Sequence, residues 1–214
     1  MPGVLELTLA GEPVQALADR ALFWPRRQRL LVADVHLGKG NIFRAAGIPV
    51  PSGGTGHDLA RLDRLLRSTG ARELWILGDF LHGARHRDVE QAWCALLAAH
   101  PQVEVGVVAG NHDRALKAAA LGVALLPEDV VDGPFRFRHY PLEAATAGDA
   151  HVLCGHLHPV VRLPGLPRHY PAFLLADGQT VLPAFSVFTG GWRIEDPGAH
   201  WIACAQGELL ASPR

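Results

Sequence analysis

The sequence predicts an α/β protein, a layered α/β/β/α sandwich with two mixed sheets. Short, nearly continuous apolar runs recur and stop at residues that bind metals, as strands buried on both faces do. Segments with helical leucine spacing separate the first of these runs, whereas beyond Val123 the pattern is one of short strands divided by Pro and Gly. Two facing sheets with outer layers would bury all the runs. A chain of 214 residues suits a single domain, 1–214.

The first expected elements are strands. Residues Val4 to Leu9 alternate in polarity, and Ala21 to Trp24 form an apolar run that stops at Pro25. Leu30 to Ala33 are continuously apolar, which indicates a strand inside the sheet. The Pro- and Gly-rich stretch from Gly47 to Gly56 then predicts a loop.

Two helices alternate with two further buried strands. Leucine spacing predicts a helix over Asp58 to Ser68, and Glu73 to Leu77 is the next strand. Asp88 is expected to cap a helix that reaches Ala99, before a strand from Val103 to Val108. With the strand that ends at Ala33, these elements form a βαβαβ unit. The strands expected in the second half cover residues 135–138, 151–154, 160–163, 185–189 and 201–205.

The bulk properties favour a cytoplasmic protein. A formal net charge of -1 lacks the basic excess of a non-specific duplex binder, so the substrate must be recruited locally. Cys94, Cys154 and Cys204 are odd in number and lie in apolar surroundings, as core residues in a reducing compartment would. The first residues form no basic leader, and no apolar run approaches the ~20 residues that cross a bilayer, so we expect no membrane association.

Candidate metal ligands follow the buried strands. Asp34 and His36 stand two apart at a strand end, so their side chains project to one side and can share a cation. Asp79 follows the second buried strand, where an unpaired carboxylate would be costly without a cation. Because ligands of such sheets gather beyond the carboxyl ends of the strands, we expect these side chains to meet on one rim.

Further ligands come from two glycine-led motifs. In Gly110-Asn111-His112-Asp113, the amide oxygen of Asn111 suits a metal that also takes carboxylate and imidazole ligands. The motif that contains His156 and His158 repeats the two-residue spacing of the first cluster. A solvated turn or an incidental histidine pair would explain a single cluster, but five clusters with one placement indicate an enzyme.

In this order, the motifs D-x-H, G-D-x-x-[DH], G-N-H-D, a lone His and G-H-x-H resemble the calcineurin-like metallophosphoesterase superfamily. The resemblance implies the metallophosphoesterase sandwich and two divalent metal ions, most often Mn²⁺, with Fe or Zn as alternatives. It implies one metal on Asp34, His36, Asp79 and His158, and a second on Asp79, Asn111, His139 and His156. His151 stays an alternative to His139, because that motif is a single residue.

The resemblance also implies a mechanism. Two cations about 4 Å apart clamp the phosphoryl oxygens and lower the pKa of a shared water, so that hydroxide attacks phosphorus in line. His112 would then give a proton to the departing alkoxide, with Asp113 as a possible orienting partner.

One motif departs from the protein phosphatases of this superfamily. They carry an aspartate where His82 stands and an arginine where Gly83 stands. A histidine at this place is similar to the double-strand-break repair nucleases. We therefore expect His82 to help position a phosphodiester. The alternative is that His82 contacts only the side chains of the metal ligands and does not touch the substrate.

Segments outside the metal motifs resemble the bacterial DNA-ligase-associated metallophosphoesterases and extend the match to nearly the whole chain. They are Leu37–Lys39, Phe43–Pro51, Thr69–Ala71, Leu182–Phe185 and Phe188–Gly191. The resemblance implies a manganese-dependent phosphodiesterase that acts on a nucleotide, a cyclic nucleotide or a nucleic-acid end. It also implies a link to DNA repair, with a DNA ligase, a helicase or an exonuclease as partner.

Four loop cations could hold a substrate phosphate: Lys39, Arg44, Arg85 and Arg87. Taken alone, each of these four side chains is more often a solvated loop charge than a phosphate-binding group. A phosphomonoesterase, a nucleotide pyrophosphatase and a non-catalytic docking module of a repair complex are the alternatives to a phosphodiesterase.

Overall fold

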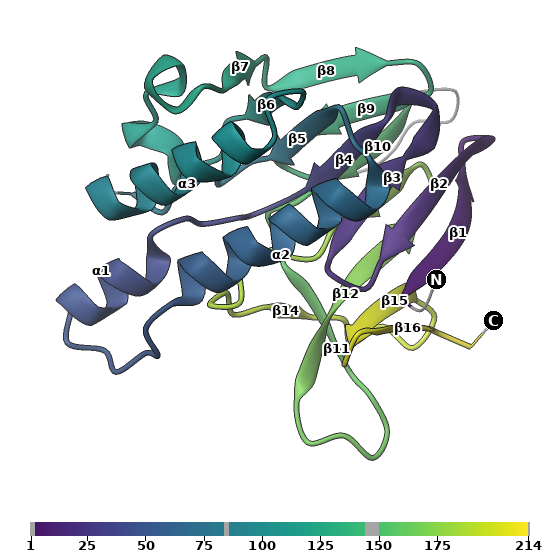
Figure 1. Ribbon diagram of the computed structural model, residues 1–214. Helices are drawn as coiled ribbons and strands as arrows, with labels where there is room; N and C mark the ends of the chain where they lie inside the picture. Colours follow the sequence, from purple (N-terminus) through teal and green to yellow (C-terminus); the bar gives the residue numbers. More distant parts are fainter. Residues whose placement is uncertain (1–2, 84–85, 144–149, 214) are drawn as a thin grey trace.

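The computed structural model describes residues 3–83, 86–143 and 150–213, and in it two mixed β-sheets pack face to face (Figure 1). The seven-stranded sheet has the order β1-β2-β3-β4-β5-β6-β7. The nine-stranded sheet has the order β14-β11-β12-β13-β10-β9-β8, and β15 and β16 extend it from β12. This architecture confirms the predicted α/β fold with two mixed sheets.

The first sheet contains the expected βαβαβ unit. Its strands are β1 (Val4–Leu9), β2 (Glu12–Leu17), β3 (Ala21–Trp24), β4 (Arg29–Val32), β5 (Glu73–Leu77), β6 (Glu104–Val108) and β7 (Ala124–Leu126). The strands from β1 to β4 pair antiparallel, and those from β4 to β7 pair parallel. Helices α2 (Gly54–Thr69) and α3 (Arg87–Ala99) make two of the three parallel crossovers, which places the ends of β4, β5 and β6 on one rim.

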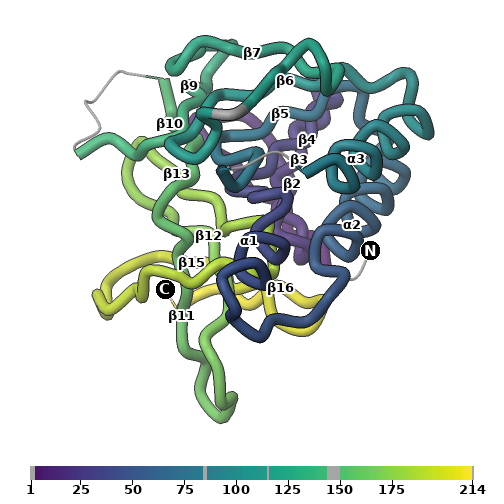
Figure 2. Tube along the Cα trace, turned by 90° about the vertical axis from the view of Figure 1, so that its left-hand side faces the viewer, coloured from purple at the N-terminus to yellow at the C-terminus, as the bar shows by residue number. Residues whose placement is uncertain are grey.

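The helices cover one face of this sheet. Figure 2 shows α2 and α3 side by side, with α1 (Lys39–Ala45) at the rim. Leu62 of α2 and Trp93 of α3 are fully buried in one cluster with Leu30 and Ile76 of the sheet. The indole N–H of Trp93 donates to the carbonyl of Leu121 at 2.9 Å, so this buried polar group is satisfied.

The second sheet packs against the other face. Its strands are β8 (Asp129–Asp132), β9 (Phe135–Arg138), β10 (His151–Cys154), β11 (Pro159–Arg162), β12 (His169–Ala176), β13 (Gln179–Val181), β14 (Trp192–Arg193), β15 (His200–Ala205) and β16 (Glu208–Ala211). Phe135, Phe137 and Leu153 meet Leu31 and Leu77 in a common core. In the described part of the chain no α-helix follows Ala99, so strands and loops form the outer layer here.

The sequence predicted a strand over Phe185–Thr189, and this prediction was wrong, because the segment is a loop. Only an isolated bridge joins Ala184 to Ala33. The N–H groups of Phe185 and Ser186 donate to the carbonyls of Ala33 and Asp34, and the carbonyl groups of Ala184 and Ser186 accept from the Arg20 side chain. The segment therefore turns away from the sheet; we call residues 184–191 the rim loop.

Two smaller expectations also need correction. Asp88 does not cap α3: the helix begins at Arg87 after His86, and no side chain caps it. The Asp88 carboxylate instead accepts a hydrogen bond of 3.2 Å from Asn41. Cys94 is exposed, whereas Cys154 and Cys204 are buried as predicted, and all three are free thiols.

Within the described residues, no helix combines the length and the apolar character required to span a membrane.

Candidate metal centre

The carboxyl ends of strands from both sheets bring the predicted ligands together. Asp34 follows β4 and Asp79 follows β5, whereas His139 and His156 follow β9 and β10 of the second sheet. One group of potential donors combines Asp34, His36 and His158, and a second combines Asp34, Asp79 and His139; within each group the donor atoms lie within 4.8 Å of one another. The rim predicted from the sequence is thus shared by the two sheets.

Asp34 is fully buried between them. Its Oδ2 accepts from the backbone N–H of His156 at 2.9 Å, which fixes the carboxylate. Its Oδ1 lies 3.5 Å from Nε2 of His158 and 3.7 Å from Nδ1 of His139. Oδ2 is therefore fixed by a backbone hydrogen bond, whereas Oδ1 faces the two imidazoles.

The two carboxylate oxygens of Asp79 likewise have different partners. Its Oδ1 accepts from the backbone N–H of His112 at 2.9 Å. Its Oδ2 lies 3.8 Å from Nε2 of His36 and 3.8 Å from Nε2 of His139. This oxygen stands between one histidine of each sheet, as a bridging ligand would.

Asn111, which follows β6 of the first sheet, meets His139 and His156, which follow β9 and β10 of the second sheet. Nε2 of His139 is 3.2 Å from Oδ1 of Asn111 and 3.2 Å from Nδ1 of His156. The ring of His151 instead pairs with the Thr180 hydroxyl at 2.9 Å, inside the second sheet. Of the two alternatives, His139 is the one that the fold places in the cluster.

The donor set fits divalent cations. Oδ1 of Asp34, Nε2 of His36 and Nε2 of His158 are buried and have no hydrogen-bond partner among the described residues. Buried polar atoms without partners are rare because desolvation is costly, and here they converge on one point. Burial, and then the positive charge of Lys39, lowers the pKa of His36, so its imidazole is neutral and can donate a lone pair. Carboxylate, imidazole and amide donors together suit Mn²⁺, Fe or Zn.

The backbone is unusual at the ligand positions. Five candidate ligands adopt the left-handed region, which non-glycine residues seldom occupy: Asp34, His36, Asp79, His156 and His158, with φ between 46° and 71°. Such conformations cost about 1–3 kcal/mol each and persist where the surroundings enforce them. Here hydrogen bonds between neighbouring loops enforce them; the His36 N–H, for example, donates to the Asp79 carbonyl at 2.7 Å.

Two glycines make room for the cluster. Gly78 has φ of +87°, and a Cβ there would overlap the His139 ring. At Gly110 a Cβ would overlap the carboxylate of Asp79. The glycines that lead the G-D and G-N-H-D motifs are therefore needed because side chains from other strands lie against their backbones.

His112 and His82 form a pair at the open side of the cluster. Their rings are stacked with centroids 4.5 Å apart, and Nδ1 of His82 is 3.2 Å from Nδ1 of His36. Burial, and then the charge of Lys39, lowers the pKa of His82 to about 4. A neutral His82 can therefore accept or donate a hydrogen bond at neutral pH.

Asp113 contacts the backbone of two neighbouring loops. Its carboxylate accepts from the backbone N–H groups of Phe80, Leu81 and Gly110, at 3.2, 2.8 and 2.9 Å. Among the described residues, no hydrogen bond joins it to the His112 ring. Through these N–H groups, Asp113 fastens the loop after β6 to the loop after β5.

The predicted loop cations separate into distinct places. Lys39 is half-buried, and burial lowers its pKa against the opposing effect of the Asp79 and Asp34 charges. Arg44 is occupied by the Asn41 side chain and the Pro51 carbonyl, and Arg87 is exposed at the start of α3. Arg85 lies outside the described residues.

Tyr140 is a site residue that the sequence reasoning missed. Its ring lies 4.6 Å from both His139 and His156, and its hydroxyl is 3.5 Å from Oδ1 of Asn111. Its position directly after a proposed ligand was the available signal. Exposed at 44%, the ring offers a surface next to the donors on which a base can stack.

Comparisons with known proteins identify a family and similar structures. The sequence profile described as calcineurin-like phosphoesterase matches residues 29–179. The crystal structure of Pseudomonas putida nuclease MPE is similar over 97% of this chain and 100% of that one, with 36% identity and a TM-score of 0.83. A protein of unknown function from Aquifex aeolicus, AQ665, is similar over 61% of this chain and 78% of its own, with 18% identity and a TM-score of 0.44. No curated protein matches the chain.

Proposed function

Because this chain belongs to the calcineurin-like phosphoesterase family and is thus a metal-dependent phosphoesterase, we propose that it is a phosphodiesterase with a dinuclear centre that cleaves nucleic acid. The observation that carries the proposal is Oδ2 of Asp79, equidistant at 3.8 Å from an imidazole of each sheet. The similar nuclease from Pseudomonas putida supports the choice of nucleic acid as substrate.

The two ions take the ligands grouped by the sequence motifs. One would be held by Asp34, His36, Asp79 and His158, and the other by Asp79, Asn111, His139 and His156. When bound, such ions supply Lewis-acid activation of the phosphate and of the attacking water. We propose Mn²⁺ as the native ion, in keeping with the ligase-associated group that the sequence resembles.

The chain's own residues position the substrate and supply the proton. The His112 backbone is held by Asp79 on its N–H side and by the N–H of Gly83 on its carbonyl side, which directs the imidazole to the open edge. From there His112 protonates the departing alkoxide. His82, stacked on it, positions the diester. Gly83 offers no guanidinium for a phosphate dianion, which favours diesters over monoesters.

A place in DNA repair, beside a DNA ligase, a helicase or an exonuclease, extends the proposal. Its support is the resemblance of the segments outside the metal motifs, including residues 43–51 and 182–185. Copurification of the tagged protein with a ligase from its own cells tests this part separately.

The activity test compares bis-p-nitrophenyl phosphate with p-nitrophenyl phosphate. Metal-stripped protein is reconstituted with Mn²⁺, Zn²⁺ or Mg²⁺. We expect a metal-dependent preference for the diester, lost by about 10²-fold or more in kcat in Asp79→Asn and His112→Ala. Faster turnover of the monoester would assign the protein to the phosphatases instead.

A matched pair of variants tests the second ion site. His139→Gln should lose bound metal, counted by elemental analysis, together with diester hydrolysis. His151→Gln removes a buried imidazole from the neighbouring strand and should keep both. If the two variants lost metal equally, the assignment of His139 as ligand would be wrong.

A further inference from the structure

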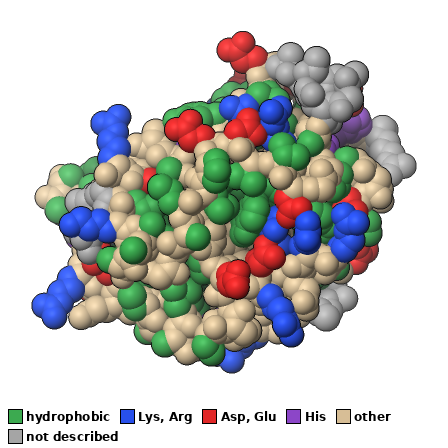
Figure 3. Space-filling model, turned by 90° about the horizontal axis from the view of Figure 1, so that it is seen from above, with side chains coloured by type: hydrophobic (Ala, Val, Ile, Leu, Met, Phe, Trp, Pro, Cys, Tyr) green, Lys and Arg blue, Asp and Glu red, His purple; other side chains and the backbone are tan. Residues whose placement is uncertain are grey.

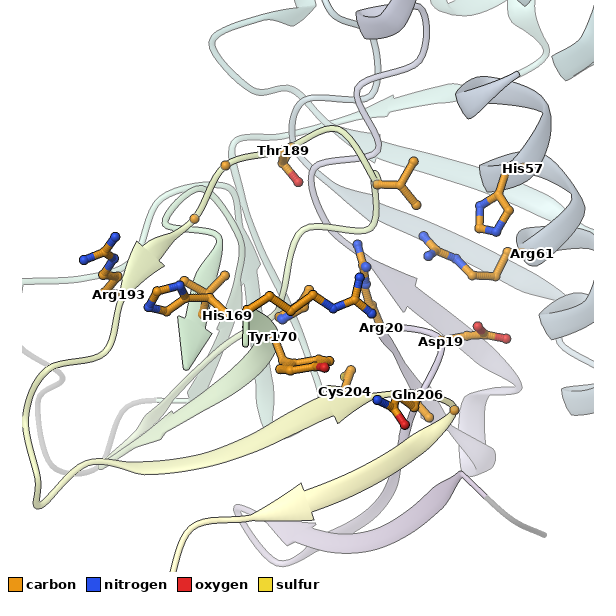
Figure 4. A pocket seen from close by; sticks show the side chains of 18 residues that line it. Asp19, Arg20, His57, Arg61, His169, Tyr170, Thr189, Arg193, Cys204 and Gln206 are labelled. Atoms are coloured by element: carbon orange, nitrogen blue, oxygen red, sulfur yellow. The ribbon is translucent and has the colours of Figure 1, made fainter. Parts of the chain in front are cut away.

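Beside the metal centre lies a cavity of about 710 Å³ whose walls carry several cations. It is bounded by the turn before β3, the first turns of α2, the rim loop, β12 and the turn between β15 and β16. Figure 4 shows Arg20 and Arg61 extending toward each other from different elements, with His169 and Tyr170 across from them. We call this space the arginine pocket. The guanidinium groups that line it belong to Arg20, Arg61, Arg168 and Arg193.

The arginine pocket adjoins the metal centre along the same rim. Arg20 immediately precedes β3, Asp34 follows β4, and these strands pair antiparallel, so both residues lie at one edge of the sheet. Neighbouring strands are about 4.8 Å apart. Residues 184–186 of the rim loop lie between the two, since they are hydrogen-bonded to Arg20 on one side and to Ala33 and Asp34 on the other.

The rim loop joins the two places physically. At one end the N–H of Ser186 donates to the Asp34 carbonyl at 3.2 Å, and directly beyond the other end the N–H of Trp192 donates to the His158 carbonyl at 3.1 Å. Between them Val187, Thr189 and Gly190 line the arginine pocket. One wall of the pocket is thus attached at both ends to segments that carry proposed metal ligands.

Most of the positive charge in the arginine pocket is not neutralised. Among the described residues, no carboxylate lies within ion-pair distance of Arg20, Arg168 or Arg193. The one acidic residue in the lining, Asp19, is 3.9 Å from Arg64, which lies outside the pocket. Guanidinium groups stay ionised, so an anion is the ligand that complements these walls.

Arg61 combines a structural contact with a free donor. It pairs with Asp58 at 3.3 Å and donates to the Phe185 carbonyl. Its Nε is buried and has no hydrogen-bond partner among the described residues. That Nε is closed off from the pocket, and the guanidinium lies 4.0 Å from the centre of the Phe185 ring, so Arg61 adds positive charge to the wall rather than a direct contact with a ligand.

The face shown in Figure 3 lacks such a charge pattern. On the face in Figure 3, acidic and basic side chains are intermingled between apolar ones. The chain as a whole has a net charge of -1, so the concentration of arginines beside the metal centre is local.

We propose that the arginine pocket binds a backbone phosphate of a single-stranded nucleic acid whose neighbouring phosphodiester lies at the metal centre. The inference rests on the proposed function and specifies its substrate as a strand rather than a small diester. The pocket holds the strand through charge and does not read bases, so binding should depend strongly on salt and little on sequence.

The test removes two exposed pocket arginines. Manganese-loaded His112→Ala protein, in which cleavage is slowed, is titrated against a fluorescent single-stranded DNA of about 12 nucleotides, and anisotropy gives Kd. Adding Arg168→Gln and Arg193→Gln should raise Kd about tenfold, and the slope of log K against log salt should fall by about 0.7 for one lost phosphate contact. The control adds Arg67→Gln and Arg72→Gln, which remove equal charge outside the pocket lining and should change Kd much less.

Turnover provides the second measurement. In otherwise unmodified protein, the pocket pair should lower kcat/KM for the oligonucleotide about tenfold relative to kcat/KM for bis-p-nitrophenyl phosphate. Equal effects of the pocket pair and the control pair on Kd would overturn the proposal. Wild-type binding of a mononucleotide as tight as that of the oligonucleotide would also overturn it. Loss of all hydrolysis with intact, pocket-dependent DNA binding would contradict only the proposed function.

Discussion

Gly78 shows how closely single residues are constrained at this site. Its φ of +87° disfavours any side chain, and a Cβ would in addition overlap the His139 imidazole. We expect Gly78→Ala to lower the free energy of unfolding by about 3 kcal/mol, of which about 1–2 kcal/mol comes from the left-handed backbone. Chemical denaturation measures the first quantity, and Mn²⁺ titration should show weaker binding because His139 is displaced.

Gly53→Ala is the matched control for this variant. Gly53 has φ of +88°, but no atom lies within 4 Å of the position that a Cβ would occupy. It should therefore show the backbone cost without the displacement of His139. Equal losses of stability and of metal affinity in the two alanine variants would refute the steric argument.

At the scale of elements, Arg29 ties the strands of the two sheets together. From β4 it donates to Glu73 of β5 at 2.7 Å and to Asp132 of β8 at 2.8 Å, and its guanidinium lies 3.6 Å from the centre of the Trp75 ring. Burial raises the pKa of Asp132, but hydrogen bonds from Arg29 and Arg27 outweigh it and hold that pKa below its usual 3.8.

A pH dependence follows from that lowered pKa. The unfolded chain takes up the Asp132 proton at a higher pH than the folded chain does, so the stabilisation exists above about pH 4 and is lost as the pH falls through the folded pKa. We expect Asp132→Asn to lower Tm at pH 7 and to lower it less at pH 3, where part of the stabilisation is already lost. A Tm difference that stayed constant between these pH values would show that the carboxylate charge has no part in the effect.

The elements also show what the sequence could predict. Continuous apolar runs identified β4, β5 and β10, because burial on both faces leaves a pattern within one segment. The rim loop carries a similar apolar run over residues 185–189, and only the Arg20 side chain and the Ala33 carbonyl, distant in sequence, explain why it is not a strand. α1 was missed because its seven residues are too few to show a periodic face.

The candidate site, too, contains residues that the sequence could predict and contacts that it could not. Motif residues such as Asp34 and Asp79 were predictable because each motif contains its own strand end. The contacts of Asp113 with the backbone N–H groups of Phe80 and Leu81 could not be predicted, since no side-chain pattern records them. The arginine pocket draws Arg20, Arg61 and Arg168 from three separate elements and leaves no local signature.

At the scale of the whole molecule, the proposed ions connect the two sheets. Asp34 and Asp79 belong to the first sheet, and His139, His156 and His158 to the second. An ion that binds only the folded protein stabilises it by about 2.7 kcal/mol at a hundredfold excess over Kd. We therefore expect chelation to lower Tm and to accelerate hydrogen exchange at the rim of both sheets.

Asp34→Asn separates this linkage from other effects of a chelator. Its Oδ1 is buried without a partner, so a neutral amide removes an uncompensated charge from the metal-free protein. The variant should have a higher Tm than wild type in chelator and a smaller rise in Tm when Mn²⁺ is added. A wild-type response to Mn²⁺ would show that the ion acts elsewhere.

The left-handed backbone at five ligand positions has a consequence for design. The turns that precede and follow these residues set the directions of their side chains. The geometry of the site therefore depends on the backbone conformation as much as on the identity of the ligands. Transplanting the same seven side chains onto another sheet edge, without those turns, would reproduce the composition of the site but not its geometry. To transfer the site, one would have to graft together all the turns that carry the ligands and the hydrogen bonds between those turns.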